Sequence, residues 1–315
     1  MIKVAHVTPW FAPAWKTGGT AVAAYNICKS LKKIGVLVTV FTTTDAGLNK
    51  KLYAHSCNKI IDNINVKYYK CGLWNLSFRQ AFFSFGLIKG IFKELKEYDI
   101  VHLHSTRNLY SLCVFITCKF YKIPYIITPH GSLMNDYINN LGHPLAKKIY
   151  TFLIDQWILR GASLIHYLTK QELNKSRKNS YSKKFTIINN GVDIDYDRNI
   201  NLEKIKYPLK ILHVGRIDPI KNTYELIKAI FHLKKYNIIL DIIGPQSDKS
   251  YFNLCSEYIT ENKIKNIKFL GSINNNKLKK IYSDYDFICQ PSLVEGASMV
   301  LIEASANGTP CLISN

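Results

Sequence analysis

The sequence predicts an α/β protein built from two Rossmann-like domains that face a central cleft. Its 315 residues exceed the roughly 100–200 of a single domain. Hydrophobic residues make up 47% of the chain and charged residues 20%, a composition typical of a folded globular protein. Short β-branched runs alternate with amphipathic stretches of helical length, and this alternation is typical of parallel βαβ units.

The first domain is expected to span residues 1–195. Its first strand leads into a loop rich in Pro and Gly and then into a helix, which is how a βαβ unit begins. We expect strands at 2–8, 36–42, 99–104, 125–128, 163–168 and 185–188, and helices at 21–34, 78–97, 107–121, 144–160 and 170–178.

The second domain is expected to span residues 196–315. It follows a seam at 193–207 that is rich in Asp and Asn and has no strong periodicity. We expect strands at 210–214, 238–243, 268–270, 287–290 and 309–313, and helices at 222–236, 249–262, 275–284 and 298–307.

The charge of the chain points to an anionic partner. Lys and Arg total 42 against 22 Asp and Glu, a formal net charge of +20. Residues 1–200 hold 27 basic and 11 acidic side chains, so most of the excess lies in the first domain. Phosphate, lipid headgroups and nucleic acid are the usual partners of such a surface. No DNA-binding or RNA-binding motif accompanies the charge, so we expect no nucleic acid partner.

The helix expected at 78–97 is a candidate for docking on an anionic membrane surface. It contains five phenylalanines and four basic residues, which is more apolar surface than one core-facing stripe needs. A helix buried in the core is the alternative. The phenylalanines are Phe78, Phe82, Phe83, Phe85 and Phe92.

The sequence favours a cytoplasmic location, peripheral on the inner face of the plasma membrane. No apolar run reaches the roughly 18 residues of a transmembrane helix. The N-terminus has no signal-peptide pattern. Eight scattered Cys without a C-x-x-C pair indicate reduced thiols.

A loop at 9–20 contains Gly18 and Gly19 and joins the first strand to the first helix. In an open α/β sheet such a loop lies at the carboxyl end of the strand, where backbone amides and the helix dipole attract an anion. Neither G-x-G-x-x-G nor G-x-x-x-x-G-K-[ST] occurs here, which argues against dinucleotide and P-loop sites. An ordinary connecting loop is the alternative.

The segment 213–222 repeats this arrangement in the second domain. A strand is expected to end at Gly215, Arg216 and Lys221 flank the turn after it, and Asn222 or Thr223 can cap the next helix. Two cations beside free helix amides suit a diphosphate, which Arg binds through its fork and Lys as a point charge. Solvated surface cations are the alternative.

Two carboxylates eight residues apart form the most specific pattern. Glu295 lies in a glycine loop, and Glu303 lies within the helix expected after it. This spacing excludes an ordinary surface pair at i and i+4. Glu303 is surrounded by apolar residues, where an unpaired carboxylate is costly and a hydroxyl-rich ligand would satisfy it.

With these motifs in this order, the chain resembles the retaining glycosyltransferases of family 4, which have the GT-B fold. Five elements spread over nearly the whole chain carry the resemblance: the Gly18-Gly19 loop, Thr128-Pro129-His130-Gly131, Asn190-Gly191-Val192-Asp193, Gly215-Arg216 with Lys221, and Glu295 with Glu303. The resemblance implies a hexosyltransferase that moves a sugar from a nucleotide-sugar donor to a glycan or lipid-linked acceptor in cell-surface polysaccharide or lipopolysaccharide synthesis. The nucleotide-sugar would be a substrate, and no metal or other cofactor is implied.

The resemblance also assigns catalytic roles. Arg216 and Lys221 would hold the donor diphosphate and stabilise the charge of the leaving nucleotide. Glu295 would bind hydroxyls of the transferred sugar, and His130 would face that sugar from the first domain. Catalysis would then depend on positioning and electrostatics without a protein nucleophile.

The donor-binding set implied by the resemblance is larger. Glu303 would accept hydrogen bonds from the ribose, and glycines would let the phosphates approach closely. Ala297 and Ser298 stand where the family often has an aromatic residue and Gly, so hydrogen bonding around the sugar is expected to differ. The full set is Gly18, Gly19, Gly215, Arg216, Lys221, Glu295, Gly296, Ala297, Ser298 and Glu303.

Two further patterns have weaker functional interpretations. Three D-x-D sequences match the manganese motif of the other glycosyltransferase fold, but their positions predict helix caps and turns. They are Asp193/Asp195, Asp195/Asp197 and Asp284/Asp286. His102 and His104 alternate with apolar residues on a strand, so they share one face, which is either cleft or core.

The end of the chain leaves an alternative function open. In the family, the second domain continues past the 309–313 strand, and its last helix returns to the first domain. This sequence stops at Asn315. We therefore expect an incomplete second domain with a bare edge strand. A non-catalytic or crippled nucleotide-sugar-binding protein is the alternative that follows, and a nucleotide-sugar epimerase is a weaker one.

Overall fold

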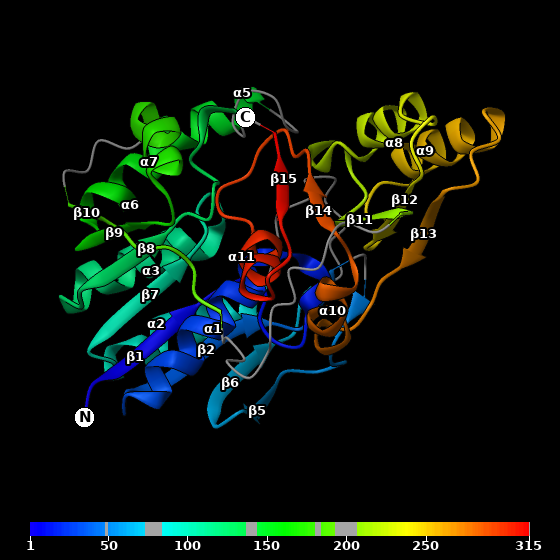
Figure 1. Cartoon of the computed structure of the whole chain (residues 1–315). Coiled ribbons are helices and arrows are strands. Elements are labelled where there is room, and N and C mark those ends of the chain that lie inside the picture. Colours follow the sequence, from blue (N-terminus) through cyan, green and yellow to red (C-terminus); the bar gives the residue numbers. More distant parts are fainter. Residues whose placement is uncertain (48–49, 73–83, 137–143, 180–183, 193–206, 315) are drawn as a thin grey trace. The chain divides into compact units, whose positions relative to one another are not determined.

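The computed structural model describes residues 1–47, 50–72, 84–136, 144–179, 184–192 and 207–314 (Figure 1). The chain divides into two compact units, Met1–Gly191 and Val192–Asn315. The boundary expected after residue 195 lies outside the described residues, as do Asp193, Asp195 and Asp197. Each unit has a largely parallel sheet and its own hydrophobic core, in agreement with the predicted α/β class.

An eight-stranded sheet forms the centre of the first unit, in the order β10-β9-β8-β7-β1-β2-β6-β5. All neighbouring strands are parallel except the β5/β6 pair. The strands are β1 (Lys3–Val7), β2 (Leu37–Thr43), β5 (Cys57–Ile61), β6 (Ile64–Tyr69), β7 (Ile100–His104), β8 (Tyr125–Thr128), β9 (Leu164–Tyr167) and β10 (Phe185–Ile187). The six strands expected from the sequence are all present.

The β5/β6 hairpin was not expected from the sequence. Its two turn residues, Asp62 and Asn63, both have positive φ, as a type I′ turn requires. Asp-Asn lacks the glycine that usually marks such a turn, so the signal is weak. A second unexpected pair, β3 (Asp45–Gly47) and β4 (Lys50–Lys51), is also antiparallel.

The helices of the first unit cover its sheet and follow the predicted order. They are α1 (Gly19–Lys33), α2 (Phe85–Glu94), α3 (Leu109–Tyr121), α5 (Pro144–Tyr150), α6 (Gln156–Gly161) and α7 (Lys170–Ser176). Side chains that the sequence offers as caps begin three of them, since Ser84, Asn108 and Thr169 accept backbone amide hydrogen bonds at α2, α3 and α7. A π-helical turn at Thr151–Asp155 joins α5 to α6.

The helix expected at 78–97 begins only at Phe85 in the structure. Leu87 and Ile91 are fully buried in the main core of the unit, so the core interpretation is correct for the inner face of α2. Phe85 and Phe92 are exposed. Phe78, Phe82 and Phe83 lie outside the described residues.

A five-stranded parallel sheet forms the centre of the second unit, in the order β13-β12-β11-β14-β15. Its strands are β11 (Leu209–Val214), β12 (Ile238–Ile243), β13 (Ile267–Gly271), β14 (Phe287–Gln290) and β15 (Cys311–Ile313). Its helices are α8 (Thr223–His232), α9 (Lys249–Glu261), α10 (Asn275–Ile281) and α11 (Met299–Ala306). All of these elements were expected from the sequence. Among the described strands, β15 lies at the edge of the sheet.

Both sheets contain a point where the strand order reverses. From β11 the chain moves outward to β12 and β13, and it then returns to the other side of β11 to form β14. In the first unit, β2 lies on one side of β1 and β7 on the other. Ligands of open α/β sheets bind beyond the carboxyl ends of the strands at such a point. Each unit therefore has one preferred place for a site.

Candidate active site

The reversal point of the second unit brings together the segments that follow β11 and β14. Gly215 and Arg216 follow β11, and the loop that carries Glu295 follows β14. A short 3₁₀ turn, Pro219–Lys221, connects the first of these segments to α8. The amide of Leu293 donates to the carbonyl of Ile220 at 2.8 Å, which fixes the two segments against each other.

Two ion pairs hold the charged side chains at this point. Nζ of Lys221 lies 2.5 Å from Oε2 of Glu295, and both side chains are partly buried. The guanidinium of Arg216 lies 3.2 Å from the carboxylate of Asp218. The structure thus brings Arg216, Lys221 and Glu295 to one end of one sheet, as the sequence predicted. Glu295 contacts a cation directly, which the sequence had not indicated.

Asp218 is a site residue that the sequence analysis missed. It is buried, and besides pairing with Arg216 it accepts the backbone amide of Lys221 at 3.2 Å through Oδ1. This bond caps the 3₁₀ turn, whereas Asn222, one of the two residues expected to cap α8, makes no side-chain capping bond. The position of Asp218 directly before Pro219 was the available signal in the sequence, because Asp followed by Pro commonly starts a helical turn.

His213 stabilises the same turn through hydrogen bonds of its ring. It is fully buried on β11, with Nδ1 2.8 Å from the carbonyl of Cys289 and Nε2 3.2 Å from Oγ1 of Thr223. Burial lowers the pKa of His213 to about 4, so the ring is neutral near pH 7. A neutral imidazole can donate from Nδ1 to the carbonyl and accept the Thr223 hydroxyl at Nε2. This ties β14, β11 and the start of α8 together.

Glu303 lies on α11 and is buried, as expected, but its carboxylate has a partner within the chain. The hydroxyl of Tyr282, itself fully buried, donates to Oε2 of Glu303 at 3.0 Å. The sequence suggested only a hydroxyl-rich ligand as partner for this carboxylate, and the structure adds a tyrosine 21 residues earlier in the chain. Burial raises the pKa of Glu303. A carboxylate has room for several hydrogen bonds, so one to Tyr282 still permits others.

Gly244 is a second residue that the sequence analysis missed. It follows β12 with φ of 156°, and a Cβ atom there would lie 1.7 Å from the carbonyl oxygen of Gly215. Only glycine allows this close approach of two backbone segments. The position of Gly215, at the end of β11, thus depends on Gly244.

The reversal point of the first unit carries the Gly18-Gly19 loop. Gly18 has φ of 115°, a backbone conformation that glycine adopts at little cost, and it directly precedes α1, which begins at Gly19. The tryptophans of this loop have structural contacts. Trp10 donates its indole N–H to Asp45 at 2.7 Å, and Trp15 packs edge-on against Tyr25.

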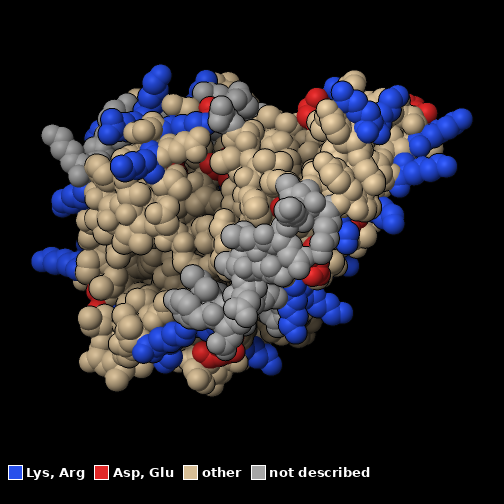
Figure 2. All heavy atoms as spheres, in the orientation of Figure 1, with Lys and Arg blue, Asp and Glu red and all other residues tan. Residues whose placement is uncertain are grey.

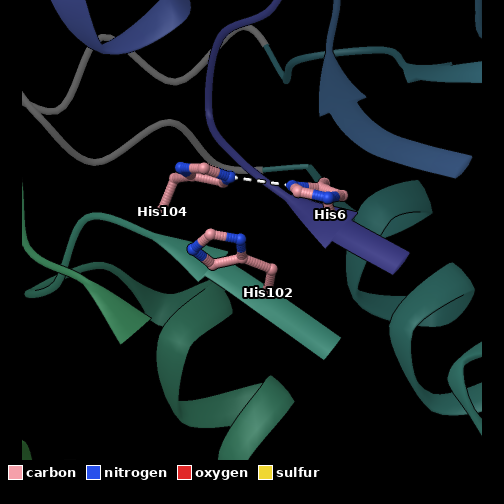
Figure 3. A group of neighbouring side chains, drawn as sticks. All are labelled: His6, His102 and His104. Atoms are coloured by element: carbon pink, nitrogen blue, oxygen red, sulfur yellow. Dashed lines mark hydrogen bonds between the residues drawn. The ribbon is translucent and has the colours of Figure 1, made fainter. Parts of the chain in front are cut away.

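Five histidines gather at the same end of the first sheet. His6 is the penultimate residue of β1, and His102 and His104 lie on the neighbouring β7 (Figure 3). All three are buried, and the rings of His102 and His104 stack with centroids 4.3 Å apart. The two β7 histidines therefore share one face, as expected, and their surroundings are those of a core. His130 and His166 complete the group at the ends of β8 and β9.

Hydrogen bonds link these histidines in two chains. Nδ1 of His6 lies 3.0 Å from Nε2 of His104, and Nδ1 of His104 lies 3.0 Å from Nε2 of His130. In the second chain, Oγ1 of Thr128 lies 2.7 Å from Nε2 of His102 and 3.0 Å from Nδ1 of His166. Burial lowers the pKa of His6 and of His130 to about 3, so both rings are neutral at physiological pH.

The predicted site residues are thus distributed between the two units. His130, Gly18 and Gly19 belong to the first unit, and the others belong to the second. Gly296, Ala297 and Ser298 lie between Glu295 and the start of α11, and Ser298 is the N-cap residue of that helix. Of the D-x-D residues, Asp286 accepts the amide of Lys210 at 2.7 Å, which ties the segment before β14 to β11 and is neither of the expected roles, a helix cap or a turn.

Within the described part of the chain, no helix combines the length and the apolar character that crossing a bilayer requires.

Comparisons with known proteins cover the whole chain. Residues 17–196 match the family Glycosyltransferase Family 4, and residues 196–315 match the family Glycosyl transferases group 1. An uncharacterized glycosyltransferase of Methanocaldococcus jannaschii is 27% identical over 349 residues, covering 100% of this chain and 80% of that protein.

Two other similar proteins have more specific descriptions. A UDP-Gal:alpha-D-GlcNAc-diphosphoundecaprenol alpha-1,3-galactosyltransferase of Escherichia coli is 27% identical over 245 residues, 71% of this chain and 60% of that protein. Among solved structures, HepE of Anabaena in complex with UDP and glucose matches with a TM-score of 0.71 at 17% identity, covering 99% of this chain and 80% of that chain.

Proposed function

The chain belongs to Glycosyltransferase Family 4 and has the two-domain GT-B fold, and from this premise we propose that it is a retaining hexosyltransferase. It would move a sugar from a nucleotide-sugar donor to a glycan or lipid-linked acceptor in cell-surface polysaccharide or lipopolysaccharide synthesis. The observation that carries the proposal is the group of Arg216, Lys221 and Glu295 at the reversal point of the second sheet. The solved complex of HepE with UDP and glucose supports a nucleotide-sugar donor by its likeness in fold.

The charges of this group suit the chemistry of sugar transfer. The bond from the anomeric carbon to the phosphate oxygen breaks, a bond from that carbon to the acceptor oxygen forms, and the acceptor proton passes to the leaving phosphate. Negative charge then grows on the diphosphate, and Arg216 and Lys221 would stabilise it as preorganised cations. Glu295, already oriented by Lys221, would accept hydrogen bonds from sugar hydroxyls.

No step of this reaction needs a metal ion, and we propose that the enzyme is metal-independent. Cations supplied by Arg216 and Lys221 can neutralise the diphosphate in the role that a divalent ion has elsewhere. Asp286 of the D-x-D sequence is engaged by a backbone amide.

We also propose that the first unit docks on an anionic membrane from the cytoplasmic side. The surface we propose is the segment from α5 to α6 with the neighbouring end of α3. The helix expected at 78–97 stays a second candidate, because Phe85 and Phe92 are exposed and residues 78–83 lie outside the described part of the chain. Phe120 and Phe152 are each 77% exposed and Trp157 is 64% exposed, which is unusual for large apolar side chains. Further exposed apolar residues of the same segments are Ile116, Tyr121, Leu145, Ile149 and Leu153.

Basic side chains accompany this apolar surface. Lys119, Lys122 and Arg160 line a cavity of about 500 Å³ beside Trp157, and no acidic residue is among its lining residues. Figure 2 shows Lys and Arg side chains gathered over the part of the first unit that carries α6 and α7. Apolar groups for the lipid boundary and cations for anionic headgroups are the two requirements of interfacial binding. The lipid-linked substrate named for the Escherichia coli relative supports this location.

Vesicle sedimentation tests the membrane surface. Binding to vesicles with anionic lipid should exceed binding to neutral vesicles and should fall as salt rises, because salt screens the cations. Phe152→Ser with Trp157→Ser should weaken binding, whereas Ile60→Ser, at an equally exposed apolar residue of β5, should not. Equal binding to both kinds of vesicle, or equal losses in the two variants, would contradict this surface.

A panel of UDP-, GDP- and ADP-sugars tests the function itself. One donor class should bind and lose its sugar, either to an acceptor or slowly to water. Donor binding without any turnover would favour the non-catalytic nucleotide-sugar-binding protein instead. No binding of any donor would contradict both functions.

A further inference from the structure

His130 is held in an uncommon backbone conformation by a residue from another element. Its φ of 52° places it in the left-handed region, which costs a non-glycine residue on the order of 1 kcal/mol or more. The amide of the next residue, Gly131, donates to Oε1 of Glu172 at 2.5 Å, and Oε2 of Glu172 accepts the amide of Leu168 at 2.7 Å. Glu172 is fully buried on α7. A buried carboxylate thus anchors the turn that carries His130.

The ring of His130 is held separately, by His104. Each neutral imidazole has one N–H donor and one acceptor nitrogen, so the direction of one bond in the chain His6, His104, His130 fixes the direction of the next. If His104 donates from Nδ1 to His130, then its Nε2 accepts from Nδ1 of His6. In the opposite direction, Nε2 of His130 donates to Nδ1 of His104, and Nε2 of His104 donates to Nδ1 of His6.

Nε2 of His6 decides between these two directions. This atom is buried and has no hydrogen-bond partner among the described residues. In the first direction it is a bare acceptor, and in the second it is an N–H donor without an acceptor. A buried N–H group without an acceptor is rarer in proteins than a buried acceptor without a donor, so the first direction is favoured. His104 then donates to Nε2 of His130, and the proton of His130 lies on Nδ1.

A metal ion is the other occupant that three close histidines suggest. The ligand atoms of His6, His102 and His104 lie within 4.8 Å of one another. However, the rings of His102 and His104 are stacked with centroids 4.3 Å apart and an interplanar angle of 27°, so their lone pairs lie in two separate, nearly parallel planes. An ion needs lone pairs that converge on one point. Both nitrogens of His104 are also within hydrogen-bond distance of other rings. The geometry favours a hydrogen-bonded chain.

We propose that His104 and Glu172 are positioning residues for His130, which they fix as a neutral ring that accepts at Nε2 and carries its proton on Nδ1. His104 sets the tautomer and the ring plane, and Glu172 sets the backbone. His130 is then a preorganised N–H donor for an oxygen of the sugar donor, a hydroxyl or a phosphate oxygen. The role of His130 toward the sugar rests on the proposed function, whereas its tautomer does not.

Histidine side-chain NMR on selectively ¹⁵N-labelled full-length protein tests the tautomer directly. With His130→Gln used to assign the signal, His130 should show the pattern of a ring protonated on Nδ1 at pH 7. In His104→Ala, which removes the donor, a mixture with the Nε2–H form should appear. His102→Asn, which alters a histidine that stacks on His104 without bonding to His130, should leave the His130 pattern unchanged. An Nε2–H ring in the wild type, or an unchanged ring in His104→Ala, would overturn the proposal.

Kinetics test the positioning role, with folding checked by circular dichroism. His104→Ala should lower kcat by about tenfold or more with a smaller change in the donor KM, because misplacing a catalytic group costs rate. His104→Asn, which can still present an amide N–H toward Nε2 of His130, should recover part of that loss. Glu172→Gln turns one acceptor oxygen into a donor facing a backbone amide, so it should lower kcat while leaving the tautomer unchanged.

The outcomes separate this proposal from the proposed function. A protein with the Nδ1–H ring that transfers no sugar would contradict the function and leave the histidine chain intact. An active protein in which His104→Ala and Glu172→Gln both retain wild-type kcat would contradict the positioning role. Stoichiometric zinc that persists after dialysis against chelator and needs His6 would replace the chain with a metal site and overturn the proposal.

Discussion

Nζ of Lys221 and Oε2 of Glu295 form an ion pair 2.5 Å long across 74 residues of sequence. The pair joins the segment after β11 to the loop after β14, and Arg216 lies on the same side. It keeps two opposite charges oriented at the place where a parallel sheet binds its ligand. In the proposed function, the diphosphate of the donor would meet a lysine already held in position.

Lys221→Ala should abolish most of the transfer activity. The variant loses a cation where charge develops in the transition state, and it leaves the Glu295 carboxylate without its partner. A loss of about 100-fold or more in kcat is expected for removal of such a group. Lys228→Ala is the matched control, because Lys228 forms an exposed pair with Glu225 on α8. Activities of the two variants within threefold of each other would contradict the role of Lys221.

Glu303→Gln should weaken donor binding without unfolding the second unit. The amide oxygen can still accept the Tyr282 hydroxyl, but a charge-assisted bond to the ribose, worth about 1.5–3 kcal/mol, would be lost. Calorimetry with the nucleoside diphosphate measures this change. Tyr282→Phe removes only the internal partner and should lower the melting temperature more than the donor affinity. Donor affinity unchanged in Glu303→Gln would remove the ribose assignment.

Acidification should destabilise the protein through its buried histidines. The pKa values of His6 and His130 are lowered to about 3 and that of His213 to about 4, chiefly by burial, against about 6.5 in an unfolded chain. Above pH 6.5 both states are neutral and no stability is lost. Between pH 6.5 and about 4, these histidines are protonated in the unfolded state but not in the folded state. Each of them therefore lowers the unfolding free energy by about 1.4 kcal/mol for every unit by which the pH falls.

Urea denaturation at pH 7.0 and pH 5.0 checks this dependence. Asp155 acts in the opposite direction, because burial raises its pKa to about 6 and it takes up a proton in the folded state first. Burial raises the pKa of Glu172 and Glu303 as well, so three carboxyl groups act in this direction. Burial lowers the pKa of six histidines, and these outweigh the three carboxyl groups, so the net stability should fall at pH 5.0. His213→Asn should reduce the dependence for the second unit. Stability that is equal at the two pH values would mean that these rings are protonated in the folded protein.

Gly244→Ala should displace the segment that carries Gly215 and Arg216. The added Cβ would lie 1.7 Å from the carbonyl oxygen of Gly215, so one backbone segment has to move. We expect a lower melting temperature and weaker donor binding together. Gly191→Ala is the control, because a Cβ there meets no atom within 4 Å. A Gly244→Ala protein with wild-type stability would contradict the close approach.

Treatment with EDTA should leave transfer intact, because cationic side chains are expected to neutralise the diphosphate. Activity lost in EDTA and restored by manganese would show that a metal ion takes part. The comparison is made at constant ionic strength, so that screening of the ion pairs does not change.

The sequence predicted the order of strands and helices well because parallel βαβ units leave a clear alternation of periods. The sheet hairpin at Asp62-Asn63 was missed because its turn lacks a glycine. The start of α2 was placed too early, since phenylalanines alone do not mark a helix boundary, whereas Ser84 does by capping Leu87.

The residues of the family motifs could be named from the sequence, but the residues that hold them in place could not. Lys221 and Glu295 were named as separate groups, but their pairing depends on two loops meeting at the end of a sheet. Tyr282, Asp218 and Glu172 were not predicted, because each acts through a contact with a distant or backbone atom and belongs to no motif. Such residues become visible only when the strand ends are placed side by side.

The most direct test of the central claim is the anomeric configuration of the product. The protein is incubated with the donor that it binds and with a lipid-linked or soluble glycan acceptor, and the product is examined by NMR. We predict one new glycosidic bond with the configuration of the donor, one nucleoside diphosphate released per bond, and no product from Arg216→Ala. A product of inverted configuration, or a donor that is bound and never consumed, would contradict the account.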